Sequence, residues 1–226
     1  FVGIFFLIPG VQIAGVALLA LPFRANIPIG AAMTFLSNPL TTPFLARHPN
    51  MRVTILSRTS SEILGGIGDL ELDAGITYLD NEPLGRVTQT PLYTEHYRFL
   101  CAPDARLAAR TQVSWSELAA EPLCLLTSDM QNRRIVDILM ADADTRRIAS
   151  VESNSTIALI AHVKSGRWCS VVPKKLAEMF TGAGDLVAIP IAEPEAAHLV
   201  GLITAKHEPQ TPVLQALVDE AVRLNR

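Results

Sequence analysis

The sequence predicts an α/β protein in which parallel strands alternate with helices. The main observation is residues 151–173, which read as a short strand, a polar turn, a helix and a second short strand. Such a unit places its two strands parallel and buries both of their faces under helices. Two further strand–helix passes between residues 27 and 77 favour a doubly wound sheet. Sheets of this kind bind small molecules where a strand ends and a helix begins, because the first N–H groups of the helix are free there.

The first of these passes is built from a strand and a proline-containing helix. Residues 27–31 read as a strand that ends at a polar break, and a helix follows to about residue 47. The helix begins either with Asn38 as its cap and Pro39 in its first position, or with Thr42 and Pro43 in those roles. Both alternatives place a proline in the first turn of the helix, where an N–H group would have no intrahelical acceptor.

The second pass contains a glycine-rich segment. Residues 51–56 (MRVTIL) alternate and are rich in β-branched side chains, which predicts a strand. Ser60 and Ser61 then cap a helix that stops in residues 65–68 (GGIG), and residues 72–77 form the next strand. The glycines lack the spacing of a phosphate-binding loop and follow a helix, so we interpret them as a helix stop.

The second half of the chain continues the alternation. Strands are expected at residues 97–101, 123–126, 151–153, 169–173, 186–191 and 199–204, and helices after Ser114, after the 127–129 turn, after Ser155 and over 213–224.

Composition excludes some functions for these residues. Of the 226 residues, 49% are hydrophobic and 18% are charged, which is typical of a folded domain. The net charge is −3, whereas a DNA-binding domain is usually basic. Cys101, Cys124 and Cys169 are far apart and each lies in an apolar run, which indicates buried thiols in a reducing cytosol. No Cys or His spacing suits a metal, so we expect neither metal nor cofactor.

Residues 1–24 form an apolar N-terminal segment of uncertain status. The first 23 carry no charged side chain and contain two prolines. Three interpretations stay open: an anchor or export signal, a segment buried against the rest of the fold, or residues foreign to the protein. We expect no membrane association unless this segment is a genuine anchor.

No catalytic motif is visible in the sequence. It contains no G-x-S-x-G elbow and no H-E-x-x-H pair, and its five histidines are scattered. The chain is therefore not expected to be an enzyme.

One polar pattern recurs instead, in four places where a predicted strand ends and a helix begins. Each member could simply cap its helix, since hydroxyl and amide side chains accept from free N–H groups. Four such turns could also converge on one cleft and hold a small anion or carboxylate. The residues are Thr34, Ser60 with Ser61, Thr127 with Ser128, and Ser153 with Asn154 and Ser155.

Five segments, in order, make the chain from residue 26 onward similar to a known family. They are residues 44–55 (FLARHPNMRVTI), 68–76 (GDLELDAGI), 91–108 (PLYTEHYRFLCAPDARLA), 118–123 (LAAEPL) and 161–173 (AHVKSGRWCSVVP). Together they resemble the effector-binding domain of the LysR-type bacterial transcription regulators. The chain departs from the family pattern at Trp168, where a glycine is usual, and at Pro43, which lies inside the first helix.

The resemblance implies a fold, a site and partners. The fold would have two Rossmann-like subdomains, residues 25–95 plus 206–226 and residues 96–205, joined by two crossover strands as in type II periplasmic binding proteins. A small-molecule effector would occupy the cleft between them, and the domains would assemble as dimers or tetramers. DNA would be bound through a helix-turn-helix domain that this chain does not contain. The residues facing the cleft would be Thr34, Ser60, Ser61, Thr77, Thr127, Ser128, Ser153 and Asn154.

The sequence thus predicts an effector-sensing domain of a cytoplasmic regulator. The alternative is an exported periplasmic solute-binding protein, which shares the bilobal architecture. The unpaired cysteines and the order of the motifs count against this alternative. An enzyme with a nucleotide cofactor fits less well, because no dinucleotide-binding loop is present.

Overall fold

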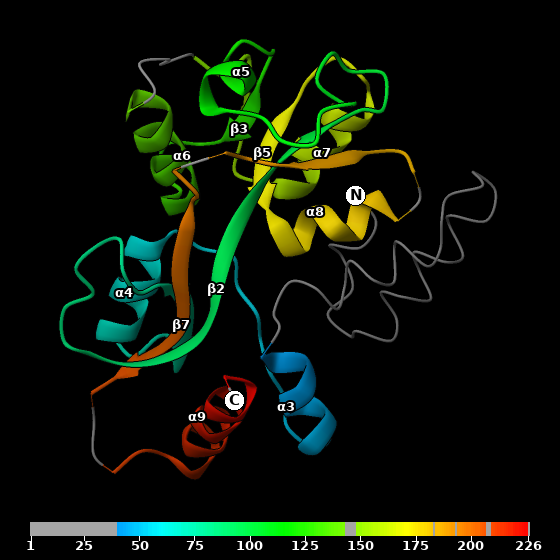
Figure 1. Ribbon diagram of the computed structural model, residues 1–226. Helices are drawn as coiled ribbons and strands as arrows, with labels where there is room; N and C mark the ends of the chain where they lie inside the picture. The colour runs from blue at the N-terminus through cyan, green and yellow to red at the C-terminus, as the bar shows by residue number, and fades with distance from the viewer. Residues whose placement is uncertain (1–39, 143–147, 183, 193, 207–208, 226) are drawn as a thin grey trace. The chain divides into compact units, whose positions relative to one another are not determined.

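The computed structural model describes residues 40–142, 148–182, 184–192, 194–206 and 209–225 (Figure 1). The chain divides into two compact units, residues 1–55 and 56–226, and each is considered separately below. The predicted strand at residues 27–31, the apolar N-terminal segment and Thr34 lie outside the described residues. In the described part of the chain, no helix is both long and apolar enough to cross a membrane.

The first unit contains one described helix, α3 (Thr41–Arg47). Leu40 precedes it without a side-chain cap, so the predicted start at Thr42 and Pro43 is wrong, and the alternative at Asn38 and Pro39 lies outside the described residues. Pro43 lies in the first turn, where N–H groups have no intrahelical acceptor, and the helix tolerates it there. The helix ends as the N–H of His48 donates to the carbonyl of Phe44 at 2.9 Å.

The predicted strand at residues 51–56 is wrong. These residues form no strand, and Val53 and Ile55 are 39% and 49% exposed. The alternation of β-branched side chains indicates that the segment would suit a sheet. A strand also needs a neighbouring strand to pair with. Among the described residues none pairs with this segment.

The second unit is built on one long strand, β2 (Val87–Cys101), which Figure 1 shows running between its two halves. The first part of β2 pairs antiparallel with β7 (Ala197–Ala205), which pairs antiparallel with β1 (Ala74–Tyr78). The last part pairs antiparallel with β5 (Ser170–Pro173) on one side and β6 (Val187–Pro190) on the other. A strand that belongs to both halves corrects the expectation of a wholly parallel sheet.

Parallel pairing is confined to the second half of the unit. There β3 (Cys124–Leu126) pairs parallel with β4 (Val151–Ser153), and Leu123 forms a parallel bridge with Cys169 beside β5. The strand–helix–strand unit predicted at residues 151–173 is confirmed as β4, α7 (Thr156–Lys164) and β5, with β3 inserted between its strands. Gly166 follows α7 at φ +79°, a conformation that favours glycine.

The remaining helices of the second half cover these strands. They are α5 (Trp115–Ala119), α6 (Gln131–Asp142) and α8 (Lys174–Thr181). A continuous core joins β2 to α5 and α6, and it includes Phe99, Trp115, Leu118 and Ile135. All three cysteines are buried free thiols, as the sequence predicted, and burial raises their pKa values.

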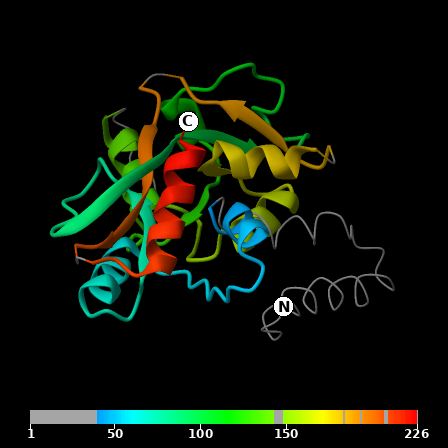
Figure 2. The same ribbon diagram turned by 90° about the horizontal axis from the view of Figure 1, so that it is seen from below.

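The first half contains α4 (Ser60–Gly68) and α9 (Pro212–Leu224). Helix α4 ends at Gly68, so the predicted stop within residues 65–68 is confirmed, although Gly65 and Gly66 lie inside the helix. A Cβ on Gly66 would lie 2.8 Å from Leu72 Cδ1, so the glycine permits a close approach of the following chain. Helix α9 begins with Thr211 as its cap and Pro212 in its first turn, and it packs against β2 (Figure 2).

Candidate functional site

The first candidate residues lie at the start of α4. Thr59 caps the helix, because its Oγ1 accepts from the N–H of Glu62 (3.3 Å) while Glu62 Oε2 accepts from the N–H of Thr59 (2.7 Å). These hydrogen bonds hold the pKa of Glu62 below its usual value. The prediction that Ser60 and Ser61 cap α4 is therefore wrong by one residue. The cap leaves the hydroxyl of Ser60 available for other partners.

Ser60, Thr77 and Gln131 form a buried triangle of oxygen atoms. Ser60 Oγ donates to Gln131 Oε1 at 2.5 Å, Thr77 Oγ1 donates to the same oxygen at 3.2 Å, and the two hydroxyl oxygens are 3.0 Å apart. The exposed fractions of Ser60, Thr77 and Gln131 are 9%, 6% and 3%. Ser60 and Thr77 come from α4 and β1 in the first half, and Gln131 begins α6 in the second. The triangle thus joins the two halves through neutral polar groups.

Two buried polar atoms in this region have no hydrogen-bond partner among the described residues. They are Gln131 Nε2 and Thr127 Oγ1. An unsatisfied buried donor or acceptor costs about 1–3 kcal/mol. If the nitrogen and oxygen of the Gln131 amide were exchanged, the atom without a partner would be an acceptor instead of a donor. One amide atom would still be unpaired. The site therefore has hydrogen-bonding capacity that the described residues do not fill.

The other predicted residues of the second half lie in two adjoining turns. The N–H of Thr127 donates to the carbonyl of Ser153 at 3.2 Å, so the ends of β3 and β4 are held together. Ser153 Oγ accepts from the N–H of Ser155 at 3.1 Å, and Ser155, not Ser153 or Asn154, caps α7. Ser128 and Asn154 are exposed at these turns.

Ser61 faces away from the triangle. It is exposed, and its hydroxyl lies 3.1 Å from Thr59 Oγ1. Sequence reasoning missed Gln131, because a polar residue that opens a helix is usually solvated. Its position four residues after Thr127, at the end of a buried strand, was the available clue.

Two arginines of α6 hold the turn before it. Arg133 is 8% exposed and donates to the carbonyl of Leu126 (2.7 Å), to Glu152 (2.7 Å) and to Asp137 (2.8 Å). Arg134 donates through Nε to Glu82 at 2.7 Å and through Nη1 to the carbonyl of Asp129 at 2.7 Å. Both guanidinium groups are thus committed to carboxylates and carbonyls of this chain. The triangle itself consists of hydroxyl and amide groups.

A tyrosine pair lies at the junction of the halves. The hydroxyls of Tyr78 and Tyr97 are 2.6 Å apart. Burial raises the pKa of Tyr78 to about 12 and raises that of Glu95, which is 6% exposed on β2. Both tyrosines are therefore neutral donors at physiological pH.

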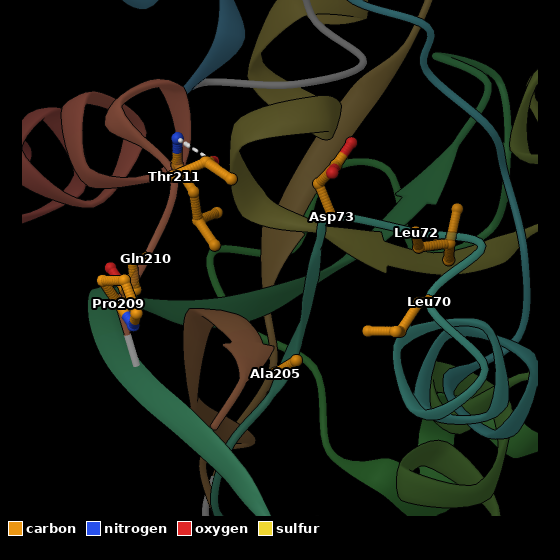
Figure 3. Close-up of a pocket in the computed structure, with 8 residues that line it drawn as sticks. Leu70, Leu72, Asp73, Ala205, Pro209, Gln210 and Thr211 are labelled. Carbon is orange, nitrogen blue, oxygen red and sulfur yellow. Dashed lines mark hydrogen bonds between the residues drawn. The ribbon is translucent and has the colours of Figure 1, made fainter. Parts of the chain in front are cut away.

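A separate hollow of about 150 Å³ lies in the first half, at the start of α9. Figure 3 shows Leu70 and Leu72 on one side of it and Pro209, Gln210 and Thr211 on the other, with Asp73 as its charged residue. It contains none of the predicted site residues. Within the described residues, no group of three or more His, Cys, Asp or Glu side chains could hold a metal.

These features define a class of protein. The second unit is an α/β domain whose two halves share a strand and meet at a polar, partly unsatisfied site, which is the arrangement of a small-molecule-binding domain. Residues 24–225 match the family model of the LysR substrate binding domain. The chain belongs to that family, so the resemblance predicted from the sequence is confirmed.

Two Escherichia coli K12 regulators are similar to this chain in sequence. The uncharacterized HTH-type transcriptional regulator YbhD is 25% identical over 168 residues, which are 74% of this chain and 52% of YbhD. The transcriptional activator protein LysR is 26% identical over 178 residues, which are 78% of this chain and 56% of LysR. The chain thus spans about half the length of these relatives.

Solved structures of the family share the fold. The effector binding domain of QuiR in complex with shikimate has a TM-score of 0.69 at 19% identity, covering 82% of this chain and 88% of that one. The regulatory domain of CcmR from Synechocystis PCC6803 in complex with 2-PG has a TM-score of 0.71 at 15% identity, covering 83% and 89%. The predicted fold class, α/β of the type II periplasmic-binding-protein kind, is confirmed.

Proposed function

We propose that this chain is the effector-sensing domain of a LysR-type transcription regulator and that it binds a small anionic molecule between its two halves. The observation that carries the proposal is the triangle, in which Ser60 and Thr77 from one half meet Gln131 from the other beside an unpaired amide hydrogen-bonding group. The site would consist of Ser60, Thr77, Gln131 and Thr127. Ser128, Ser153 and Asn154 complete the set that we assign to its surroundings.

An acceptor-rich ligand suits these groups. Two hydroxyls already converge on one oxygen, and the Gln131 amide adds two further N–H donors. Hydrogen bonds to a charged acceptor are roughly twice as strong as neutral ones, so a carboxylate or phosphate oxygen gains most from this arrangement. The shikimate and 2-PG complexes of two structural neighbours agree with a small polar effector.

Regulation would follow from a shift between two arrangements of the halves. An effector that contacts both halves favours one arrangement by as much as its affinities for the two differ. In the full protein, this change would alter the geometry of a dimer or tetramer and so the spacing of its DNA-binding domains. A structure of full-length CbnR has been solved with its target DNA, and this chain covers 65% of that protein. A cytoplasmic location accords with such a role.

The comparisons favour the regulator over the alternative of an exported solute-binding protein. The matching family and the curated relatives are both of the regulator type. They also favour a sensor over an enzyme, because this family is one of transcription regulators.

A ligand screen tests the proposed site. The 226-residue chain is heated with small carboxylic and phosphorylated acids, shikimate among them, and with the neutral amide of each acid. Acids that raise the melting temperature are then titrated by calorimetry against Ser60→Ala and Thr77→Val. Each substitution removes a donor to a charged oxygen, so affinity should fall about 10–100-fold.

The exposed neighbour Ser61 provides the matched control. Ser61→Ala should bind the same acid as tightly as the unmodified chain, because its hydroxyl contacts Thr59 and not the triangle. If Ser60→Ala and Thr77→Val both bind within about twofold of the unmodified chain, the site is wrongly assigned.

A further inference from the structure

Gln131 Oε1 occupies the position that a ligand oxygen would take at this site. It accepts from Ser60 Oγ and from Thr77 Oγ1, two donors carried by different elements of the first half. The C=O group of a side-chain amide presents an acceptor oxygen, as each C–O group of a carboxylate does. The chain thus places one of its own oxygens where the two hydroxyls converge.

The bridge made by this oxygen is incomplete. Three oxygen–oxygen contacts share only the two hydroxyl hydrogens of Ser60 and Thr77, so one contact of the triangle lacks a hydrogen. The buried Nε2 of Gln131 has no partner among the described residues. An amide held in this way is easier to displace than a fully satisfied one.

The first turn of α6 carries a further contact to the first half. Arg134 pairs with Glu82 through a 2.7 Å hydrogen bond. Gln131 and Arg134 therefore form a two-point contact, which we call the α6 bridge. It joins the start of α6 to the first half.

We propose that the Gln131 carboxamide is a built-in substitute for the effector's carboxylate, and that the effector acts by displacing it from Ser60 and Thr77. This inference rests on the proposed function and adds its regulation. The displaced amide keeps its place at the start of α6, where its N–H groups can donate to the second oxygen of the incoming carboxylate. The effector thereby replaces Gln131 as the partner of Ser60 and Thr77, and Gln131 sets the threshold for binding.

The test removes the Gln131 carboxamide and supplies a small carboxylate in solution instead. Gln131→Ala leaves the two hydroxyls without their acceptor and opens space for a small molecule. Sodium acetate, acetamide and sodium chloride, at matched concentration, are the probes, and the melting temperature of the 226-residue chain is the readout. Acetate should raise the melting temperature of Gln131→Ala by about 3–6 °C at ten times its Kd, and acetamide by less. Against the sodium chloride baseline, acetate should leave the unmodified chain unchanged.

Two control variants separate this result from general salt effects. Ser60→Ala combined with Gln131→Ala removes a donor as well as the amide, so the response to acetate should be lost. Gln112→Ala removes an exposed glutamine outside the site and should behave as the unmodified chain. The inference is overturned if acetamide stabilises Gln131→Ala as much as acetate does, if acetate has no effect on it, or if the response survives the loss of the Ser60 hydroxyl.

Gln131→Glu covers the case in which the alanine variant does not fold. It keeps the size of the side chain and supplies a carboxylate within the chain, so it should bind the acid found in the ligand screen at least about tenfold more weakly. Unchanged affinity would overturn the inference. A Ser60-dependent response of the unmodified chain, combined with failure of these variants, would refute the substitute role of Gln131 and leave the proposed function standing.

Discussion

Replacing Arg133 should destabilise the fold more than any exposed arginine would. Its guanidinium is 8% exposed and donates to the carbonyl of Leu126 and to Glu152 and Asp137. Arg133→Met keeps an unbranched apolar stem but leaves that buried carbonyl without this donor, which costs about 1–3 kcal/mol. Glu152 and Asp137 have side chains 43% and 35% exposed, so each lost ion pair adds at most about 1 kcal/mol.

We therefore expect Arg133→Met to lower the free energy of unfolding by about 2–4 kcal/mol. Urea denaturation followed by far-UV circular dichroism measures the change. Arg134→Met is the matched control, because its side chain is 35% exposed and its loss should cost about 1 kcal/mol or less. If the two variants unfold at the same urea concentration, Arg133 does not hold the β3–β4–α6 junction as the contacts indicate.

Two further perturbations test the packing and the electrostatics of β2 and β7. Gly201→Ala would place a Cβ 2.4 Å from Leu79 Cδ1 and 2.7 Å from the carbonyl oxygen of Thr90. It should lower the free energy of unfolding by about 1–3 kcal/mol, measured in a thermal melt. The Cβ of Gly68→Ala would meet nothing within 4 Å, so this control should be neutral. Glu95 has a raised pKa, because burial disfavours its charged form. The folded state therefore holds this proton more tightly than the unfolded chain, and stability falls as pH rises from below the unfolded value through the folded pKa. Glu95→Gln should remove this loss, so its stability relative to the unmodified chain should grow between pH 4 and pH 8 in urea titrations, and a constant difference would contradict the assignment.

Local patterns predicted the local elements. The unit β4–α7–β5 was read correctly because its polar turn, apolar helix face and Gly166 all lie within 23 consecutive residues. The cap of α4 was misplaced by one residue, since Thr59 and Ser60 both have the right chemistry. Only the glutamate three residues on decides in favour of Thr59.

Contacts between distant residues could not be read in the same way. The antiparallel pairing of β2 with β5, β6 and β7 depends on strand directions that no local pattern encodes. At the site, Ser60 and Thr77 were predicted and are 3.0 Å apart, but their partner Gln131 lies 54 residues beyond Thr77. A glutamine in that position looks like a solvated helix residue until the fold buries it.

The course of β2 explains how a small contact could move the whole domain. One strand is hydrogen-bonded into the sheets of both halves, so the halves cannot separate without breaking its ladder. Its register shifts between Pro91 and Tyr93, and such irregularities allow a strand to bend. The irregularity lies within the β2–β7 ladder, before the part of β2 that pairs with β5 and β6, and the α6 bridge spans the halves at the triangle. Replacement of the Gln131 amide by a ligand would therefore change the angle between the two halves. Because β2 runs through both halves, they would rotate relative to each other and would not separate.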